Sequence, residues 1–404
     1  MQAPPRVRFL DRTTPPHIAT LILVAGLSAM AMNVFLPSLP SMAEHFGTDY
    51  SVMQLSVPLY LFISGFMQLF IGPISDNLGR RKVMIGSLVL FLIATLGCIL
   101  APTTAVFLFF RMAQAIIATG MVLSRAVIRD LYTQDQSASM IGYVTMGMAL
   151  VPMISPAIGG ALDQLFGWQA PFWLLFCAGT AALMLVGRDM GETARESGKS
   201  LLAQFGDYPE LLRSRRFWGY AASAGFSSGA FFAYLGGAPF VGSEVFGMNA
   251  FWLGMLFGAP AVGYFVGNFI TARCATRFGI NRLVLWGCIA NAVGGVVSLV
   301  LFLMGYGSPA TFFGMMTFVG LGNGLCIPNA TAGMLSVRPH LAGTASGLGG
   351  AIMIVGGAAL SALAGFLLTP QTGAYPLLWL MLLTALAGCA AILVVIRREK
   401  TLGL

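Results

Sequence analysis

The stretch Gly72-Pro73-Ile74-Ser75-Asp76-Asn77-Leu78-Gly79-Arg80-Arg81-Lys82 separates two long apolar segments of the chain, at about residues 50–73 and 83–101. Gly72 and Pro73 are expected to end the first segment, because proline removes a backbone donor from a helix. Gly79 permits a tight turn. Asp76 and Arg80 can pair with each other or with neighbouring helix ends. The stretch therefore predicts a short basic turn between two apolar helices.

The composition places these helices in a membrane. Of the 404 residues, 57% are hydrophobic and 9% are charged, with a mean hydropathy of +0.83. A soluble domain carries roughly 25% charged residues, so this chain could not cover a soluble surface. Disorder is excluded by the large amount of apolar surface. The six cysteines lie in apolar stretches without the spacing of metal ligands, which indicates buried apolar residues.

Twelve apolar segments are long enough to cross a hydrocarbon core of about 30 Å, which takes roughly 20 residues. We predict a helix in each, because barrel strands would alternate in polarity and open strands leave backbone groups unpaired in lipid. The segments are 17–38, 50–73, 83–101, 105–128, 137–162, 168–187, 217–240, 249–272, 282–304, 309–334, 342–367 and 374–396. The predicted fold class is an all-α membrane protein.

The basic residues predict its orientation. All but two of the 22 Lys and Arg residues fall on one side of the membrane when both termini are placed in the cytoplasm. The longest polar stretch, 188–216, is interpreted as a cytoplasmic linker between an N-terminal half, 1–187, and a C-terminal half, 217–404. Each half has six predicted helices, and two such halves around a midplane cavity are common in secondary transporters.

The segment 105–128 holds both remaining basic residues, Arg111 and Arg125, together with Gln114. A buried arginine costs roughly 2.5–3.5 kcal/mol in a membrane helix and normally faces a cavity or a partner. On a straight α-helix, Arg111 and Arg125 lie within about 40° of one face and ~21 Å apart. We therefore predict that Arg111, Gln114, Arg125 and Arg129 form one polar stripe toward a cavity, with Asp130 at the inner end of the helix. Alternatively, the arginines reach the lipid headgroups at either side.

The segment 137–162 holds two prolines four residues apart, Pro152 and Pro156, followed by Gly159 and Gly160. The prolines are expected to bend this helix and free backbone carbonyls. The glycines allow close contact with a neighbouring helix. The alternative is a kinked packing helix without a specific role in transport.

Other polar residues at membrane depth either line a cavity or form hydrogen bonds between helices. These candidates are Gln54, Tyr60, Gln68, Tyr234, Asn268, Asn323 and Asn329. The 23 methionines and 30 phenylalanines would suit an adaptable apolar pocket.

These motifs resemble those of the major facilitator superfamily. Gly72, Asp76, Gly79, Arg80 and Arg81 match its loop signature G-x-L-x-D-r-x-G-R-[RK]; Arg111 and Gln114 match R-x-x-Q-G; Pro156, Gly159 and Gly160 match the end of an antiporter signature, G-P-x-x-G-G. The stretches 33–40, 125–132, 167–173 and 342–347 are similar to the bicyclomycin/chloramphenicol resistance (Bcr/CflA) branch of drug:proton antiporters.

The resemblance implies a monomeric, multi-pass exporter of small drugs in the bacterial inner membrane, coupled to protons. It departs at Asn33 and Phe35, where the branch usually has an acid and a tyrosine. None of the fourteen acidic residues lies at mid-membrane, so the usual proton-exchanging carboxylate is missing. With Arg111 and Asn33 in the cavity and no carboxylate beside them, we expect neutral or anionic amphiphiles to be preferred over cations.

The leading interpretation is a secondary transporter that exports small amphiphilic compounds by alternating access. An exporter or importer of a specific metabolite on the same fold is the main alternative, and a membrane sensor or scaffold without transport activity is a third. An enzyme is not expected, because the sequence has no nucleophile–base pair, phosphate loop or metal cluster. We expect no cofactor and no nucleic-acid partner; the partners are the substrate, protons and lipid.

Overall fold

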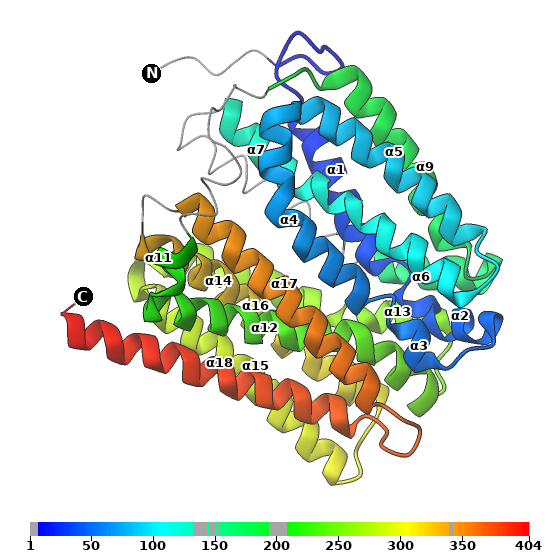
Figure 1. Cartoon of the computed structure of the whole chain (residues 1–404). Coiled ribbons are helices and arrows are strands. Elements are labelled where there is room, and N and C mark those ends of the chain that lie inside the picture. Colours follow the sequence, from blue (N-terminus) through cyan, green and yellow to red (C-terminus); the bar gives the residue numbers. More distant parts are fainter. Residues whose placement is uncertain are drawn as a thin grey trace.

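The computed structural model describes residues 7–131, 144, 151, 154–193, 208–338 and 342–403, and every regular element in these ranges is a helix. The helices form two bundles that lie against each other (Figure 1). The N-terminal bundle consists of α1 (Ile18–Asn33), η1 (Leu36–Ser38), α2 (Leu39–Phe46), α3 (Tyr50–Gln54), α4 (Pro58–Leu78), α5 (Arg80–Ile99), α6 (Thr104–Ala113), η2 (Gln114–Ile117), α7 (Ala118–Leu131) and α9 (Ala170–Asp189). The C-terminal bundle consists of α11 (Tyr208–Leu212), α12 (Arg215–Phe240), η3 (Val241–Val245), α13 (Ala250–Phe257), α14 (Ala259–Phe278), α15 (Ile280–Leu303), α16 (Pro309–Val337), α17 (Ala342–Leu367) and α18 (Tyr375–Leu402). The predicted all-helical fold is confirmed for the described residues.

Ten helical segments in the described ranges are long and apolar enough to cross a membrane. The predicted helix 217–240 is also present, as α12, but it is less apolar than these ten. Its 26 residues correspond to about 39 Å, which exceeds the thickness of a hydrocarbon core. Of the predicted helix 137–162, residues 154–162 belong to a described helical stretch, 154–166, and most of the rest lies outside the described residues. The count of twelve therefore stays a prediction.

The prediction that Gly72 and Pro73 end a helix was wrong. Helix α4 continues to Leu78 and ends at Gly79, whose φ is +96°. Helix α14 ends in the same way at Gly279, whose φ is +80°. A membrane helix tolerates an internal proline because neighbouring groups satisfy the freed backbone. A positive φ, in contrast, is rarely adopted by a residue with a Cβ, so the glycine sets the helix end in both bundles.

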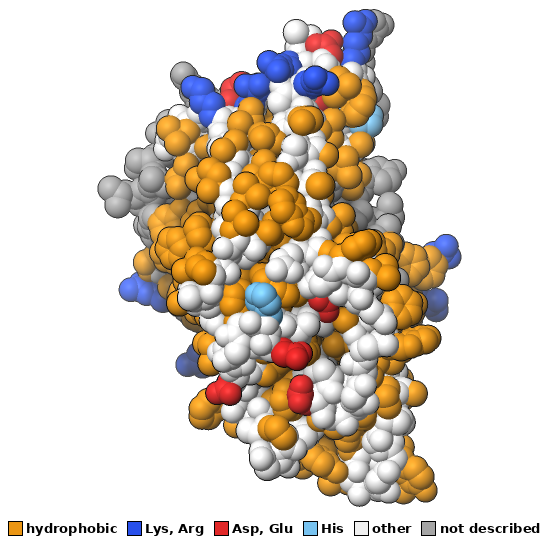
Figure 2. Space-filling model, turned by 90° about the vertical axis from the view of Figure 1, so that its right-hand side faces the viewer, with side chains coloured by type: hydrophobic (Ala, Val, Ile, Leu, Met, Phe, Trp, Pro, Cys, Tyr) orange, Lys and Arg blue, Asp and Glu red, His pale blue; other side chains and the backbone are white. Residues whose placement is uncertain are grey.

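The two ends of the molecule differ in charge. The start of α5, the start of α12 and the end of α18 carry Arg80, Arg81, Arg215, Arg216, Arg397 and Arg398. We call this the basic end; it lies on the upper and left-hand side of Figure 1. At the opposite, acidic end, α2, η1, α3 and α13 lie together, and Glu44 and Asp49 belong to this region. In Figure 2, acidic side chains gather in the lower middle of the face shown, and most Lys and Arg side chains lie at its top and edges.

The outer surface of both bundles is apolar. Large side chains such as Leu100, Phe166 and Phe366 are 73%, 74% and 81% exposed. A surface of this kind is stable against lipid and not against water. Inside the C-terminal bundle, glycines bring helices into backbone contact: a Cβ on Gly320 of α16 would lie 1.6 Å from the carbonyl oxygen of Pro260 on α14. The close helix approach expected from the glycine content is therefore present.

Candidate functional site: a cavity between the bundles

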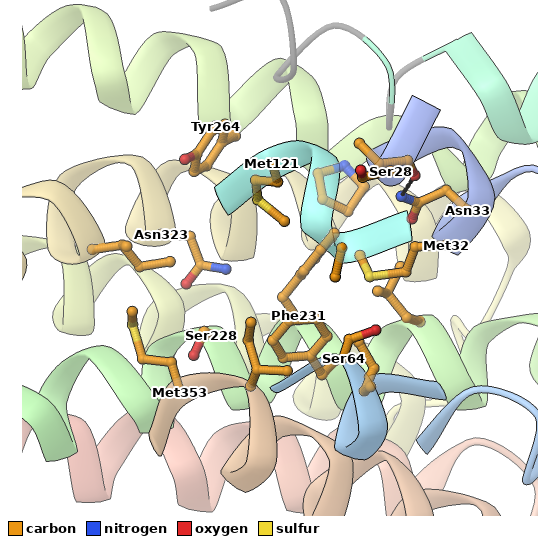
Figure 3. Close-up of a pocket in the computed structure, with 18 of the residues that line it drawn as sticks. Ser28, Met32, Asn33, Ser64, Met121, Ser228, Phe231, Tyr264, Asn323 and Met353 are labelled. Carbon is orange, nitrogen blue, oxygen red and sulfur yellow. Dashed lines mark hydrogen bonds between the residues drawn. The ribbon is translucent and has the colours of Figure 1, made fainter. Parts of the chain in front are cut away.

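A cavity of about 350 Å³ lies between the two bundles. Its walls come from α1, α4 and α7 of the N-terminal bundle and from α12, α13, α14, α16 and α17 of the C-terminal bundle. Most of the lining is apolar, with Met32 and Met121 on one side and Phe231 and Met353 on the other (Figure 3). Apolar walls with a few polar groups are typical of a small-molecule site.

Nine of the lining residues have polar side chains, contributed by both bundles. They are Ser28, Asn33, Tyr60, Ser64, Gln68, Arg125, Ser228, Tyr264 and Asn323. Five of these were cavity candidates from the sequence: Asn33, Tyr60, Gln68, Arg125 and Asn323. Ser28, Ser64, Ser228 and Tyr264 were not, because the sequence gives no sign of which turn of a buried helix faces a cavity.

Arg125 is the one charged residue among the described side chains that line the cavity. It lies on α7, where Ala118, Met121 and Arg125 follow one another along the cavity-facing side. The side chain is exposed rather than covered by its neighbours, and it has no ion pair or hydrogen bond to a residue of the described ranges. Among the described residues, no acidic group therefore neutralises the positive charge of Arg125 in the cavity.

Asn33, the residue in place of the expected acid, also lines the cavity, at the end of α1. Its Nδ2 donates to the carbonyl oxygen of Ala29 at 2.7 Å, and its buried Oδ1 has no partner in the described structure. The amide is therefore positioned by its own helix, with one polar atom unsatisfied.

Arg111 does not line the cavity, contrary to the prediction that it shares the cavity with Asn33. Its side chain is 1% exposed, so it does not reach lipid headgroups either. The guanidinium carbon lies 4.1 Å from the ring centre of Phe35 and 4.0 Å from that of Tyr60, and the group donates to Gln114 and to the carbonyl oxygen of Ala31. Gln114 in turn donates to Thr95 at 2.8 Å. Arg111 therefore joins four helices inside the N-terminal bundle, behind the Tyr60 ring.

The single polar stripe predicted for this region is also absent. The helix is interrupted by the 3₁₀ turn η2, so that α6 carries Arg111 and α7 carries Arg125. A 3₁₀ turn advances about 120° per residue and an α-helix 100°, so the four residues of η2 change the angle between the two arginines only from about 40° short of a full turn to about 40° past it. The two positions therefore differ through their neighbours: Phe35 and Tyr60 cover Arg111, whereas Arg125 borders the cavity.

Arg80 at the basic end is paired with Asp130, at the end of α7. The Nε of Arg80 lies 3.0 Å from Asp130 Oδ2, and the guanidinium also donates to Ser75 Oγ. The Arg80 backbone N–H donates to Glu192 Oε1 at 2.7 Å. Asp130, predicted among the cavity residues, is thus part of an ion pair outside the cavity lining.

Arg81 is a further residue of the predicted loop motif, and its side chain contacts the end of α9. Arg81 donates to the carbonyl oxygens of Met190 at 2.8 Å and Gly187 at 3.2 Å, which ties the start of α5 to the end of α9. The side-chain positions of Gly72, Pro73 and Asp76 lie outside the described residues.

At the acidic end, the helical stretch 154–166 lies between the bundles. A Cβ on Gly159 would lie 1.6 Å from the carbonyl oxygen of Val34, and a Cβ on Gly160 would lie 2.1 Å from that of Ala250. Conversely, a Cβ on Gly254 of α13 would lie 2.4 Å from the carbonyl oxygen of Pro156. The contacts of Gly160 and Gly254 join this stretch to α13 of the C-terminal bundle, and the contact of Gly159 joins it to the end of α1. Pro152 lies outside the described residues.

Gln54 makes a second contact between the bundles, in keeping with the alternative that it forms a hydrogen bond between helices rather than lining the cavity. Its Nε2 donates to the carbonyl oxygen of Ser361 at 3.0 Å. The side chain fits between two glycines: a Cβ on Gly365 would lie 1.2 Å from its Oε1, and a Cβ on Gly236 would lie 2.4 Å from its Nε2. The residue is 1% exposed.

Three other polar candidates form hydrogen bonds within the C-terminal bundle. Tyr234 donates to the carbonyl oxygen of Phe257 at 2.9 Å, and Asn268 donates to that of Tyr264 at 2.8 Å. Asn329 donates to Leu325 and Thr271. Over the part of the chain that the structure describes, no three His, Cys, Asp or Glu residues are grouped to hold a metal ion.

Comparison with known proteins identifies the fold and the family. The chain matches the family model described as Major Facilitator Superfamily over residues 21–361. It is 30% identical to multidrug resistance protein D of Escherichia coli, over 91% of this chain and 92% of that protein. It is 27% identical to a chloramphenicol resistance protein of Pseudomonas aeruginosa, over 93% of this chain and 90% of that protein.

Solved structures share the fold at lower identity. A variant of the peptide transporter POT in complex with sulfate superposes with a TM-score of 0.77, at 13% identity, over 99% of this chain and 97% of that chain. A bacterial homolog of the human lysosomal transporter Spinster, in an inward-facing and occupied conformation, gives 0.73 at 17% identity, over 94% and 96%.

The family model covers most of the chain, and the relatives are transport and resistance proteins aligned along nearly their whole length. The protein is thus a transporter and not an enzyme, and it is a multi-pass protein of the bacterial inner membrane. The chain belongs to the Major Facilitator Superfamily and, within it, to the Bcr/CflA branch of drug transporters.

Proposed function

We propose that the protein exports small amphiphilic compounds by alternating access of the cavity between its bundles. In this proposal the halves 1–187 and 217–404 each contain six membrane helices and are joined by the cytoplasmic linker 188–216. The basic end, with both termini, faces the cytoplasm, in keeping with the positive-inside rule. The observation that carries the proposal is the cavity itself, which both bundles line and which is apolar apart from a few polar groups.

The direction of transport is inferred from two sources. The relatives are named for resistance to chloramphenicol and to multiple drugs, which requires removal of the compound from the cell. The helical stretch 154–166 of this chain also keeps the glycines and proline of an exporter motif, Pro156, Gly159 and Gly160. Their contacts with Val34, Ala250 and Gly254 support a role in closing the acidic end of the cavity.

The proposed gating group is the cluster around Arg80 at the basic end. Its ion pair with Asp130 and its backbone contact with Glu192 join α5 to α7 and to the segment after α9. These partners would have to separate when the basic end changes conformation. Protons are the proposed coupling ion. Because the described cavity lining has no carboxylate, we place proton exchange at an edge acid, with Asp130 as the first candidate.

A drug-susceptibility screen in a pump-deleted bacterial host would test this function. Wild type is compared with empty vector and with Gly160→Leu, expressed at equal levels in the membrane. Wild type should raise the inhibitory concentration of at least one phenicol or other amphiphile, with lower cell accumulation of that compound, and Gly160→Leu should not. Equal accumulation in all three strains, or higher accumulation with wild type, would contradict export.

A further inference from the structure

The charge of the cavity restricts which ligands it can bind. Arg125 is exposed inside the cavity, without an ion pair, and no acid accompanies it among the described lining residues. A lone guanidinium in such a setting repels a cation and attracts an anion. The other arginine of this region, Arg111, is already enclosed by two aromatic rings, Gln114 and a carbonyl oxygen, and has no surface to offer a ligand.

The wall opposite α7 adds a polar group and an apolar surface. Ser227 lies 2.6 Å from one end of the Asn323 amide, and the other end of this amide points into the cavity (Figure 3). Tyr264 also lines this region, and its hydroxyl makes no hydrogen bond within the described part of the chain. Phe231 and Met353 supply an adaptable apolar surface beside them.

We propose that Arg125 binds the negatively charged group of an amphiphilic monoanion, such as an aryl carboxylate or aryl sulfonate, whose apolar body fills the rest of the cavity. The inference rests on the proposed transport function and specifies its substrate class. Arginine suits this role because its planar fork donates two parallel hydrogen bonds to a carboxylate or sulfonate. The volume of about 350 Å³ is at the small end of the range for ligand sites, which fits one such molecule.

A set of three naphthalene probes of similar shape separates charge from shape. They are naphthalene-2-sulfonate, the neutral naphthalene-2-sulfonamide, and a naphthyl trimethylammonium cation. Binding of each to the purified full chain in lipid nanodiscs is measured by titration calorimetry, after subtraction of binding to empty nanodiscs. Wild type should bind the sulfonate at least tenfold more tightly than the sulfonamide, and the cation most weakly.

Variants test whether Arg125 causes this preference. Arg125→Gln should remove the tenfold preference while changing sulfonamide affinity by less than twofold, and Arg125→Lys should keep part of it. Arg273→Gln is the matched control, because Arg273 is exposed on α14 beside Phe269 and does not line the cavity. It should leave all three affinities unchanged. The thermal midpoint of each variant checks that the fold is retained.

Equal wild-type affinity for the three probes would overturn the proposal, as would an equal loss of all three affinities in Arg125→Gln. The measurement does not depend on transport. An intact charge preference in a protein that exports nothing would contradict the proposed function and leave this inference standing. Export by a protein that shows no charge preference would contradict this inference and leave the proposed function standing.

Discussion

Gln54 and Gly365 provide a test of the contact that joins the bundles at the acidic end. In Gly365→Ala, the new Cβ would lie 1.2 Å from Gln54 Oε1 and 2.3 Å from its Cδ, so the glutamine must leave its site. Its hydrogen bond to Ser361, at 3.0 Å, is then lost. Losing a hydrogen bond in a buried site costs about 0.5–1.5 kcal/mol, and forcing extra volume into a packed site costs about 1–3 kcal/mol.

A shift of about 2 kcal/mol between conformations corresponds to a change of about 30-fold in their ratio. Gly365→Ala should therefore favour the conformation in which the acidic end is open. Gln54→Ala alone loses the hydrogen bond and should shift the ratio in the same direction. The double variant Gln54→Ala/Gly365→Ala should be milder than the sum of the single variants, because the added methyl group fits the space that the glutamine vacates.

The assay is labelling of a cavity cysteine from outside intact cells with a membrane-impermeant maleimide. Ser64→Cys, on the cavity wall, is introduced into a transport-competent background without the six native cysteines. Gly356→Ala is the control on the same helix, because a Cβ there meets no atom within 4 Å. Labelling in Gly365→Ala that equals that in Gly356→Ala, or strict additivity in the double variant, would refute the reasoning.

Three further changes test the other contacts. Gly160→Leu should abolish transport at normal expression, since a Cβ would lie 2.1 Å from the carbonyl oxygen of Ala250. Gly187→Leu should be tolerated, because a Cβ there meets nothing within 4 Å. Equal drug-efflux rates in the two variants would contradict this reasoning. Asp130→Asn should slow efflux, because Arg80 is only 5% exposed and loses its charged partner. Glu210→Gln should not slow efflux, since the ion pair of Glu210 with Arg338 is about half exposed and contributes about 0–1 kcal/mol. Arg111→Ala should lower the thermal midpoint by several degrees, as expected for the loss of about 3 kcal/mol from a buried charged network. It should leave the charge preference of the cavity unchanged. A changed preference with a normal midpoint would place Arg111 in the site.

Much of the fold can be predicted from the sequence, because it depends on local properties of the chain. Low charge and long apolar segments require membrane helices, because lipid offers no partner to an unpaired backbone group. Gly79 and Gly279 occupy equivalent turns, and both adopt a positive φ that a Cβ would oppose. The basic residues gather at one end of the described structure, as their spacing along the chain predicted. Each of these properties depends on residues that are neighbours in sequence.

The identity of the residues in the cavity was decided by tertiary structure. Arg111 and Arg125 belong to one predicted helix, yet Phe35 and Tyr60 cover Arg111 inside the N-terminal bundle, whereas Arg125 lines the cavity. For Gln54 the sequence left open a cavity position or a hydrogen bond between helices, and the site that decides it is formed by Gly236 and Gly365, which are far from it in sequence. A hydropathy pattern records how apolar a helix is, and in a membrane protein both lipid and the bundle interior accept apolar residues. The side of the helix on which a polar side chain finds its partner therefore depends on which helix packs against it. That contact exists only once the two halves of the chain have come together.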